Sequence, residues 1–181
     1  MTLHWRKELI ESCKRGSRHA QQELYEQYKD AMYNVAYRMT QNTHDAEDIL
    51  VSSFTDVFRN INSYDFRATP GAWIKRIVIN NSITHLNKKK VDLVFFEVQP
   101  EVVEEPHLEV EELVSTDLIK DCITELPDGY RTVLTLYLIE GYDHNEIGTV
   151  LGVTTATSKS QYSRARKKLK EIIKGQLSQT A

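Results

Sequence analysis

The sequence predicts an all-α protein with two small helical domains joined by an acidic linker. Apolar residues recur at steps of three and four along most of the chain, which is typical of amphipathic helices. One stretch, residues 91–117, interrupts that pattern with two prolines, nine acidic residues and neither Lys nor Arg. Near the C-terminus, a short helical segment, a glycine and a longer basic segment follow one another, and this order predicts a helix-turn-helix.

The N-terminal part is expected to form helices over residues 18–40, 45–60 and 72–87. In the first of these, Leu24, Val35 and Met39 fall on one helical face. The second begins with acidic residues, which suit the positive end of the helix dipole. Residues 61–71, INSYDFRATPG, are rich in Asn, Ser, Pro and Gly and are therefore expected to form a loop.

The C-terminal part is expected to form helices over residues 117–127, 129–141 and 143–151, and a last helix after residue 154. Asp143 and Glu146 match a capping box. Gly152 supplies a turn, and Thr154 is a natural N-cap for the last helix. Four apolar side chains of this part are expected in the core: Leu134, Leu136, Leu138 and Ile147.

Composition excludes several classes of protein. The chain has 181 residues, is 40% hydrophobic and 27% charged, and has no apolar run near the ~20 residues that cross a membrane. We expect no signal peptide, and the lone thiols Cys13 and Cys122 indicate a reducing compartment, so the cytoplasm is expected. No catalytic motif of the HExxH, GxSxG or GxGxxG kind occurs, and there is no phosphate-binding loop. We therefore expect no enzyme, no metal site and no cofactor.

Hydroxyl and basic side chains are concentrated in residues 153–172, VTTATSKSQYSRARKKLKEI, although the chain has a net charge of -3. One helical face holds Lys159, Ser160, Ser163 and Arg164, and the opposite face, which can pack, holds Ala165, Leu169, Ile172 and Ile173. Lys and Arg can bind guanine acceptors in a major groove, and the basic turn that follows suits phosphates. An ordinary solvated helix is the alternative. The capped helix and glycine turn before this segment favour DNA.

Three segments together resemble a bacterial RNA polymerase sigma factor: DAEDILVSSFTDVF, AWIKRIVINN and LPDGYRTVLTLYLIEGYDHNEIGTVLGVTTATSKSQYSRARKKL. Each segment alone is a weak signal, whereas three in this order and spacing are specific. The resemblance is to the extracytoplasmic-function (ECF) type, which has only regions 2 and 4. It implies a region 2-like domain over residues 1–90, for core polymerase and the -10 element, then a linker over residues 91–117. A region 4-like helix-turn-helix over residues 118–181 would bind the -35 element.

The resemblance also implies three sets of contact residues. Contacts to the -35 element are expected from Thr155, Thr157, Lys159, Ser160, Gln161, Ser163, Arg164, Arg166 and Lys167. Contacts to the -10 element, where a captured base and aromatic stacking offset the cost of unstacking, are expected from Tyr64, Phe66, Arg67, Trp73, Arg76 and Asn80. Core polymerase is expected to bind Glu47, Asp48, Ser52 and Ser53. Trp73 also fits a core position, and the acids of that second helix also fit simple dipole stabilisation.

The chain departs from the family pattern at several of these positions. The family usually has Gln-Glu where this chain has Ser52-Ser53, and often has Asp at the position of Thr84. Where the common pattern has Val and Arg, this chain has Ser158 and Gln161. We expect Ser158 to loosen the packing of the last helix, and Gln161 to change one base contact.

The implied partners are the RNA polymerase core, promoter DNA and an anti-sigma factor, without direct membrane insertion. The acidic linker is expected either to follow the RNA exit path of the polymerase or to act as a solubilising tether. The alternative function is a stand-alone helix-turn-helix regulator whose N-terminal part senses a ligand or dimerises. Binding to core polymerase distinguishes the two functions.

Overall fold

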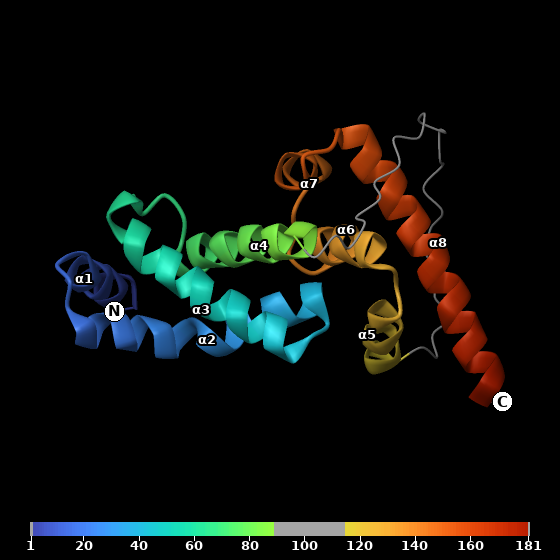
Figure 1. Ribbon diagram of the computed structural model, residues 1–181, viewed down its shortest axis with the longest axis horizontal. Coiled ribbons are helices and arrows are strands. Elements are labelled where there is room, and N and C mark those ends of the chain that lie inside the picture. The colour runs from blue at the N-terminus through green and yellow to red at the C-terminus, as the bar shows by residue number, and fades with distance from the viewer. Residues whose placement is uncertain (1, 89–114, 181) are drawn as a thin grey trace. The chain divides into compact units, whose positions relative to one another are not determined.

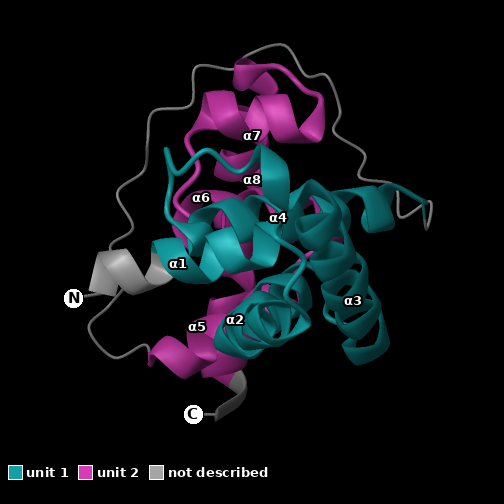
Figure 2. Cartoon of the chain, turned by 90° about the vertical axis from the view of Figure 1, so that its left-hand side faces the viewer, with its two compact units in different colours: residues 1–89 teal, residues 90–181 magenta. Residues whose placement is uncertain are grey.

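The chain divides into two compact units, which Figure 2 colours separately: unit 1, residues 1–89, and unit 2, residues 90–181. The computed structural model describes residues 2–88 and 115–180, and the side chains of residues 7–88 and 115–178. The described residues form helices joined by short connections, so the all-α prediction is confirmed. The expected acidic linker, residues 91–117, lies almost entirely outside the described residues.

Unit 1 is built around three mutually packed helices. Its described elements (Figure 1) are α1 (Thr2–Lys14), α2 (Arg18–Thr40), α3 (Thr43–Asn60), the 3-10 turn η1 (Ile61–Ser63) and α4 (Pro70–Lys88). Helices α2, α3 and α4 pack against one another, and α1 packs on α2 and η1. The most enclosed core side chains include Leu24, Met39, Val57, Ile74 and Ile79, each at most 1% exposed. The predicted apolar face of α2, which holds Leu24, Val35 and Met39, is therefore confirmed as a buried face.

Helix boundaries in unit 1 follow from local capping. Helix α3 begins at Thr43 because Asn42 Oδ1 accepts a hydrogen bond from Asp45 N at 3.0 Å. Helix α4 begins at Pro70, two residues before the predicted start, because proline suits a first turn and Thr69 Oγ1 accepts from Ala72 N at 3.2 Å. The sequence did not predict α1, in which Leu9, Ile10 and Cys13 are buried among the described side chains.

Unit 2 is arranged around its longest helix. Its described elements are α5 (Thr116–Thr124), α6 (Asp128–Leu138), α7 (His144–Leu151) and α8 (Thr155–Thr180), and α5, α6 and α7 each pack on α8. The core cluster contains Cys122, Leu126, Leu134, Ala165 and Leu169. The expected packing face of α8 is thus confirmed.

The connection between α7 and α8 has the tight geometry of a helix-turn-helix. The capping box is confirmed, because Asp143 Oδ1 accepts from Glu146 N at 2.8 Å and Glu146 Oε2 accepts from Asp143 N at 2.9 Å. Gly152 ends α7 with a φ of 69°, where a side chain is disfavoured. Gly148 allows a close approach, because a Cβ there would lie 2.8 Å from Val153 O.

One predicted core residue of unit 2 is on the surface. Leu134, Leu136 and Ile147 are fully buried, but Leu138 is 50% exposed, so its assignment to the core was wrong. Leu138 is the last residue of α6, and the next residue, Ile139, is also exposed. Among the described residues, no helix combines the length and apolar character needed to cross a membrane.

Candidate nucleic-acid and polymerase interface

The first half of α8 carries the basic face predicted from the sequence. Lys159 and Lys167 are exposed, and Ser160, Ser163 and Arg164 are partly exposed. Residues 147–170 contain no acidic side chain, and the nearest acid that follows, Glu171, pairs with Lys168 at 3.4 Å, away from Lys159 and Arg164. Thr155 is also partly exposed, although its hydroxyl donates to Asn145 Oδ1 at 2.8 Å. This surface is suited to a polyanion.

Two of the residues expected to contact the -35 element face the interior of unit 2. Gln161 is 1% exposed and Thr157 is 5% exposed. Thr157 Oγ1 lies 2.8 Å from Thr154 Oγ1 at the start of the helix. Buried side chains do not reach base edges, so we remove Thr157 and Gln161 from the candidate DNA surface. They are buried because α8 packs on three helices, and its interior face is therefore wide.

An aromatic and polar cluster fixes the start of α8 to α6 and α7. Ser158 is fully buried, and its Oγ lies 2.9 Å from His144 Nδ1. The His144 ring stacks on Tyr137, with centroids 4.5 Å apart, and Tyr162 lies at the same distance from Tyr137. Ser158 therefore connects α8 to α7 instead of loosening it. No sequence pattern indicates this cluster, because its members are separated along the chain.

The loop between η1 and α4, residues 64–69, is organised by Tyr64. This residue is 3% exposed, and its hydroxyl donates to Ala68 O at 2.5 Å. Its ring lies 4.8 Å from that of Phe66 and 5.1 Å from that of Trp73. Burial raises the pKa of the Tyr64 hydroxyl, so it stays a protonated donor. Tyr64 therefore supports the loop and is removed from the expected DNA contacts.

The other residues expected to contact the -10 element are accessible. Phe66 is 37% exposed, and the Arg67 side chain is 90% exposed with its Nε 3.0 Å from Asp65 Oδ2. Arg76 and Asn80 are exposed on α4. Trp73 is only partly exposed, because one side of it packs on Tyr64. Trp73, Arg76 and Asn80 are spaced along one face of α4.

The expected polymerase-binding residues of α3 separate into exposed and buried positions. Glu47, Asp48 and Ser52 are exposed, but Ser53 is fully buried. Ser53 Oγ accepts a hydrogen bond from Asn81 Nδ2 at 3.2 Å, so it joins α3 to α4 and is removed from the candidate surface. Beside Ser52, Val51 is 64% exposed, which marks an apolar spot that the sequence reasoning missed.

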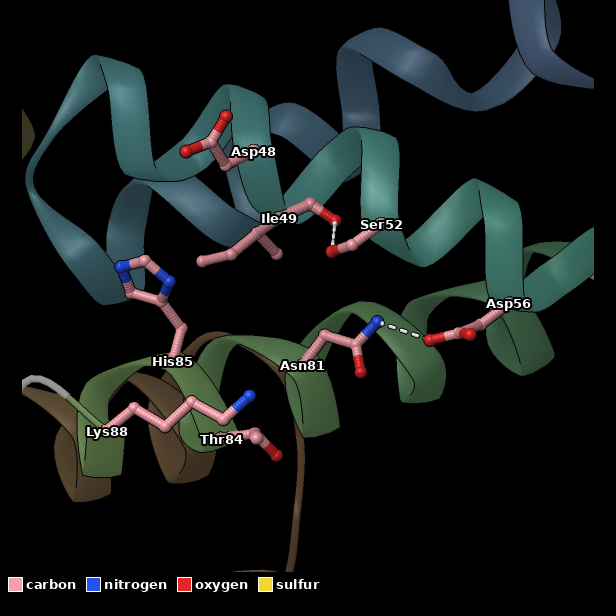
Figure 3. Close-up of a pocket in the computed structure, with 8 residues that line it drawn as sticks. All are labelled: Asp48, Ile49, Ser52, Asp56, Asn81, Thr84, His85 and Lys88. Carbon is pink, nitrogen blue, oxygen red and sulfur yellow. Dashed lines mark hydrogen bonds between the residues drawn. The ribbon is translucent and has the colours of Figure 1, made fainter.

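A groove between α3 and α4 adjoins this surface. It encloses about 360 Å³ and is lined by Asp48, Ile49, Ser52, Asp56, Asn81, Thr84, His85 and Lys88 (Figure 3). Asn81 crosses it and donates to Asp56 Oδ2 at 3.0 Å. His85 Nε2 lies 3.3 Å from Asp45 Oδ1. Thr84, which stands where the family often has Asp, lines the groove with an uncharged side chain.

Two family models match the chain: Sigma-70 region 2 over residues 24–91, and Sigma-70 region 4 over residues 116–169. The chain is 32% identical over 180 residues to the ECF RNA polymerase sigma factor SigW of Bacillus subtilis, with 93% of this chain and 96% of SigW covered. It is 28% identical over 155 residues to SigM of the same organism, another ECF sigma factor, with 83% of this chain and 93% of SigM covered.

Solved structures have the same fold. The sigma factor RpoE of Bartonella quintana, in complex with the anti-sigma factor NepR, matches with a TM-score of 0.56 at 20% identity, over 84% of this chain and 96% of RpoE. CnrH, in complex with the cytosolic domain of CnrY, matches with a TM-score of 0.55 at 18% identity, over 94% and 97%. At these identities the likeness supports the fold alone. On the sequence matches, the chain belongs to the ECF sigma factors, non-enzymatic proteins that direct RNA polymerase to promoters.

Proposed function

We propose that the two units divide promoter recognition between them. Unit 1 binds the polymerase core through α3 and binds the -10 element through the loop and α4, and unit 2 binds the -35 element through α8. Membership of the sigma family favours this division over a stand-alone regulator. The observation that carries the proposal is the exposed basic face of α8, directly after a helix-turn-helix connection.

For the -35 element, α8 enters the major groove with the face that holds Lys159 and Arg164. Their cationic groups hydrogen-bond to guanine acceptors, and Ser160 and Ser163 contact base edges or phosphates at close range. Thr155 begins the same face, while Arg166 and Lys167 in the following turns neutralise phosphates.

For the -10 element, unit 1 receives unpaired bases of one strand. Unstacking costs about 1.4 kcal/mol per base step, and stacking on an aromatic ring returns about 1–3 kcal/mol per base. Phe66 and Trp73 offer rings, and Arg67 and Arg76 offer charge to the strand. Asn80 offers an amide to a base edge.

For polymerase, α3 offers a mixed surface of carboxylates, a hydroxyl and an apolar side chain. Glu47, Asp48 and Ser52 supply the polar contacts, and Val51 supplies an apolar contact beside them. A polar rim around an apolar contact is the usual composition of a protein interface. The adjacent groove between α3 and α4 gives this surface a concave edge.

We further propose that an anti-sigma factor holds the free chain, as the relatives RpoE and CnrH were solved with such partners or with a partner's cytosolic domain. The chain would act in the cytoplasm, where polymerase and DNA are found. The acidic residues 91–117 would discourage nonspecific binding to DNA between the two contact sites.

Run-off transcription with purified core polymerase and genomic fragments tests the proposal. New start sites that appear only with the chain define the promoter, and Lys159→Ala and Arg164→Ala should each weaken -35 recognition by about 1–3 kcal/mol. Lys174→Ala, at the exposed far end of α8, is the matched control and should keep transcription within twofold. Unchanged -35 recognition in both helix variants would remove the groove assignment.

A further inference from the structure

We propose that Lys14, the last residue of α1, is a positioning residue for the loop of residues 64–69. It would hold this loop in the conformation that receives an unpaired base of the -10 element. The inference rests on the proposed function of unit 1 and extends it to a helix that precedes the region 2 match, which begins at residue 24. Lys14 would act through the loop, without contacting DNA.

The Lys14 ammonium has three partners, two of which belong to the loop. Nζ donates to Tyr64 O at 3.0 Å and lies 4.7 Å from the centroid of the Phe66 ring. Its third partner is Glu11 Oε1, at 3.4 Å on α1 itself. Lys14 thus joins α1 to a loop fifty residues further along the chain. A charged donor strengthens the hydrogen bond to the carbonyl, and the ring attracts the same cation.

The backbone of the loop needs such support. Phe66 has a φ of 64°, in the left-handed region, where a residue with a side chain costs roughly 1–2 kcal/mol. Tyr64 restrains the loop from inside through its hydroxyl bond to Ala68 O. Lys14 restrains it from the α1 side, by holding the carbonyl of Tyr64 and the ring of Phe66 together. A residue in an unfavourable backbone conformation keeps it only when several surrounding contacts hold it there.

The enclosure of Lys14 distinguishes a positioning role from a direct contact with DNA. Its side chain is only 19% exposed, and its ammonium is already shared among a carbonyl, a ring and a carboxylate. An ammonium carries three N–H donors, so these three contacts leave none for a phosphate. Lys7 is exposed, but its Nζ lies 5.9 Å from the Phe66 centroid, so its hold on the ring is weaker.

Helix α1 is anchored independently of this contact, which makes the role of Lys14 separable. Leu9, Ile10 and Cys13 are buried, at 7%, 1% and 1% exposure. Burial, with a smaller contribution from Glu23, raises the pKa of the Cys13 thiol and keeps it unreactive while α1 is docked. The reactivity of Cys13 therefore reports whether a substitution at Lys14 releases the helix.

The test uses holoenzyme made from purified core and the full chain, with the promoter found by run-off transcription. The probe is a forked duplex whose non-template strand is single-stranded over the -10 element, with an abasic nucleotide placed at each position in turn. Lys14→Met keeps the aliphatic stem and removes the charge. Arg15→Met is the matched control, because it removes the same charge from an exposed neighbour. Among the described residues, the Arg15 guanidinium donates a hydrogen bond only to Ser12 Oγ. Lys14→Arg tests rescue.

We expect Lys14→Met to weaken binding of the intact fork about tenfold, the combined effect of a lost charged hydrogen bond and a lost cation–π contact. Arg15→Met should stay within twofold, and Lys14→Arg should recover most of the loss. At one position of the probe, an abasic nucleotide should weaken binding of the wild-type chain most. The same abasic nucleotide should weaken binding of Lys14→Met much less, because both changes remove the same base contact. Cys13, mapped by mass spectrometry after thiol labelling, should stay protected in Lys14→Met.

Three results would overturn the inference: intact binding in Lys14→Met, a Lys14→Met loss that simply adds to every abasic loss, or labelling of Cys13 in that variant. The last result would mean that Lys14 docks the whole helix and does not position the loop. A wild-type chain that is insensitive to every abasic position would instead reject base capture by unit 1, which is the proposed function itself. The two failures are therefore distinct.

Discussion

The two units hold their candidate recognition elements in different ways. In unit 2, the start of α8 is fixed by a capping box on α7, a close glycine contact and the contact between the buried Ser158 and His144. In unit 1, the loop of residues 64–69 has a strained residue and is restrained by Tyr64 and one lysine. A helix that reads an intact duplex needs a fixed surface before binding. A loop that captures an unpaired base needs room for that base, and this loop is restrained by separate side-chain contacts, which include Asp65 Oδ1 accepting from Arg67 N at 3.1 Å.

The largest expected effect tests how rigid the turn of unit 2 is. Gly148→Ala would place a Cβ 2.8 Å from Val153 O, a backbone atom that cannot move away without shifting α8. We expect this overpacking to destabilise unit 2 by about 1–3 kcal/mol. Amide hydrogen exchange should become faster in α6, α7 and α8 and stay unchanged in α2, α3 and α4.

Gly175→Ala is the matched control for this substitution. A Cβ at Gly175, also within a helix, meets nothing within 4 Å. The higher helix propensity of Ala should therefore stabilise α8 by up to about 1 kcal/mol, and amide exchange in α8 should become slower. Equal effects of the two substitutions would show that the α7–α8 turn is not closely packed, and would weaken the contrast between the units.

A smaller effect is expected where the family pattern and the structure disagree. Ser158→Val restores the common family residue, and packing alone would make it stabilising. We expect instead a loss of about 1 kcal/mol in the free energy of unfolding, because His144 Nδ1 loses its partner. Thermal unfolding measures this change, and Thr149→Val, on the exposed side of α7, serves as the control. If the Ser158→Val chain is instead more stable, packing alone holds α8 in place and the contact with His144 does not contribute.

Local patterns predicted much of the fold. The apolar periodicity and the cap at Asp143 each depend on residues within a turn or two, and the structure confirms them. Helix α1 escaped prediction because its buried face, among the described side chains, is the short apolar set Leu9, Ile10 and Cys13. The contact from Lys14 to Tyr64 joins residues fifty positions apart, and no periodicity reveals such a pair.

The candidate sites show the same limit. Helical spacing correctly grouped Lys159 and Arg164 on an accessible face, but it did not indicate how wide the buried face of α8 is. Gln161 is a polar residue on a basic helix, and the sequence alone therefore placed it outside. It is nevertheless only 1% exposed, on a helix that packs on three others. Ser53 was misplaced for the same reason, because α4 covers it through Asn81.

The smallest expected effect concerns Gln161. It tests whether every buried polar group near the start of α8 helps to hold the helix in place. Gln161 Nε2 is buried and has no hydrogen-bond partner among the described residues, and an unsatisfied buried donor lowers stability. Gln161→Met keeps a similar length without that donor, so we expect the free energy of unfolding to rise by about 1 kcal/mol. Affinity for the -35 duplex should stay within twofold, whereas Arg164→Met should lose affinity without gaining stability. A loss of affinity for the -35 duplex in Gln161→Met would return this residue to the DNA surface. It would also mean that α8 shifts when it binds DNA, so that unit 2 is less rigid than its packing indicates.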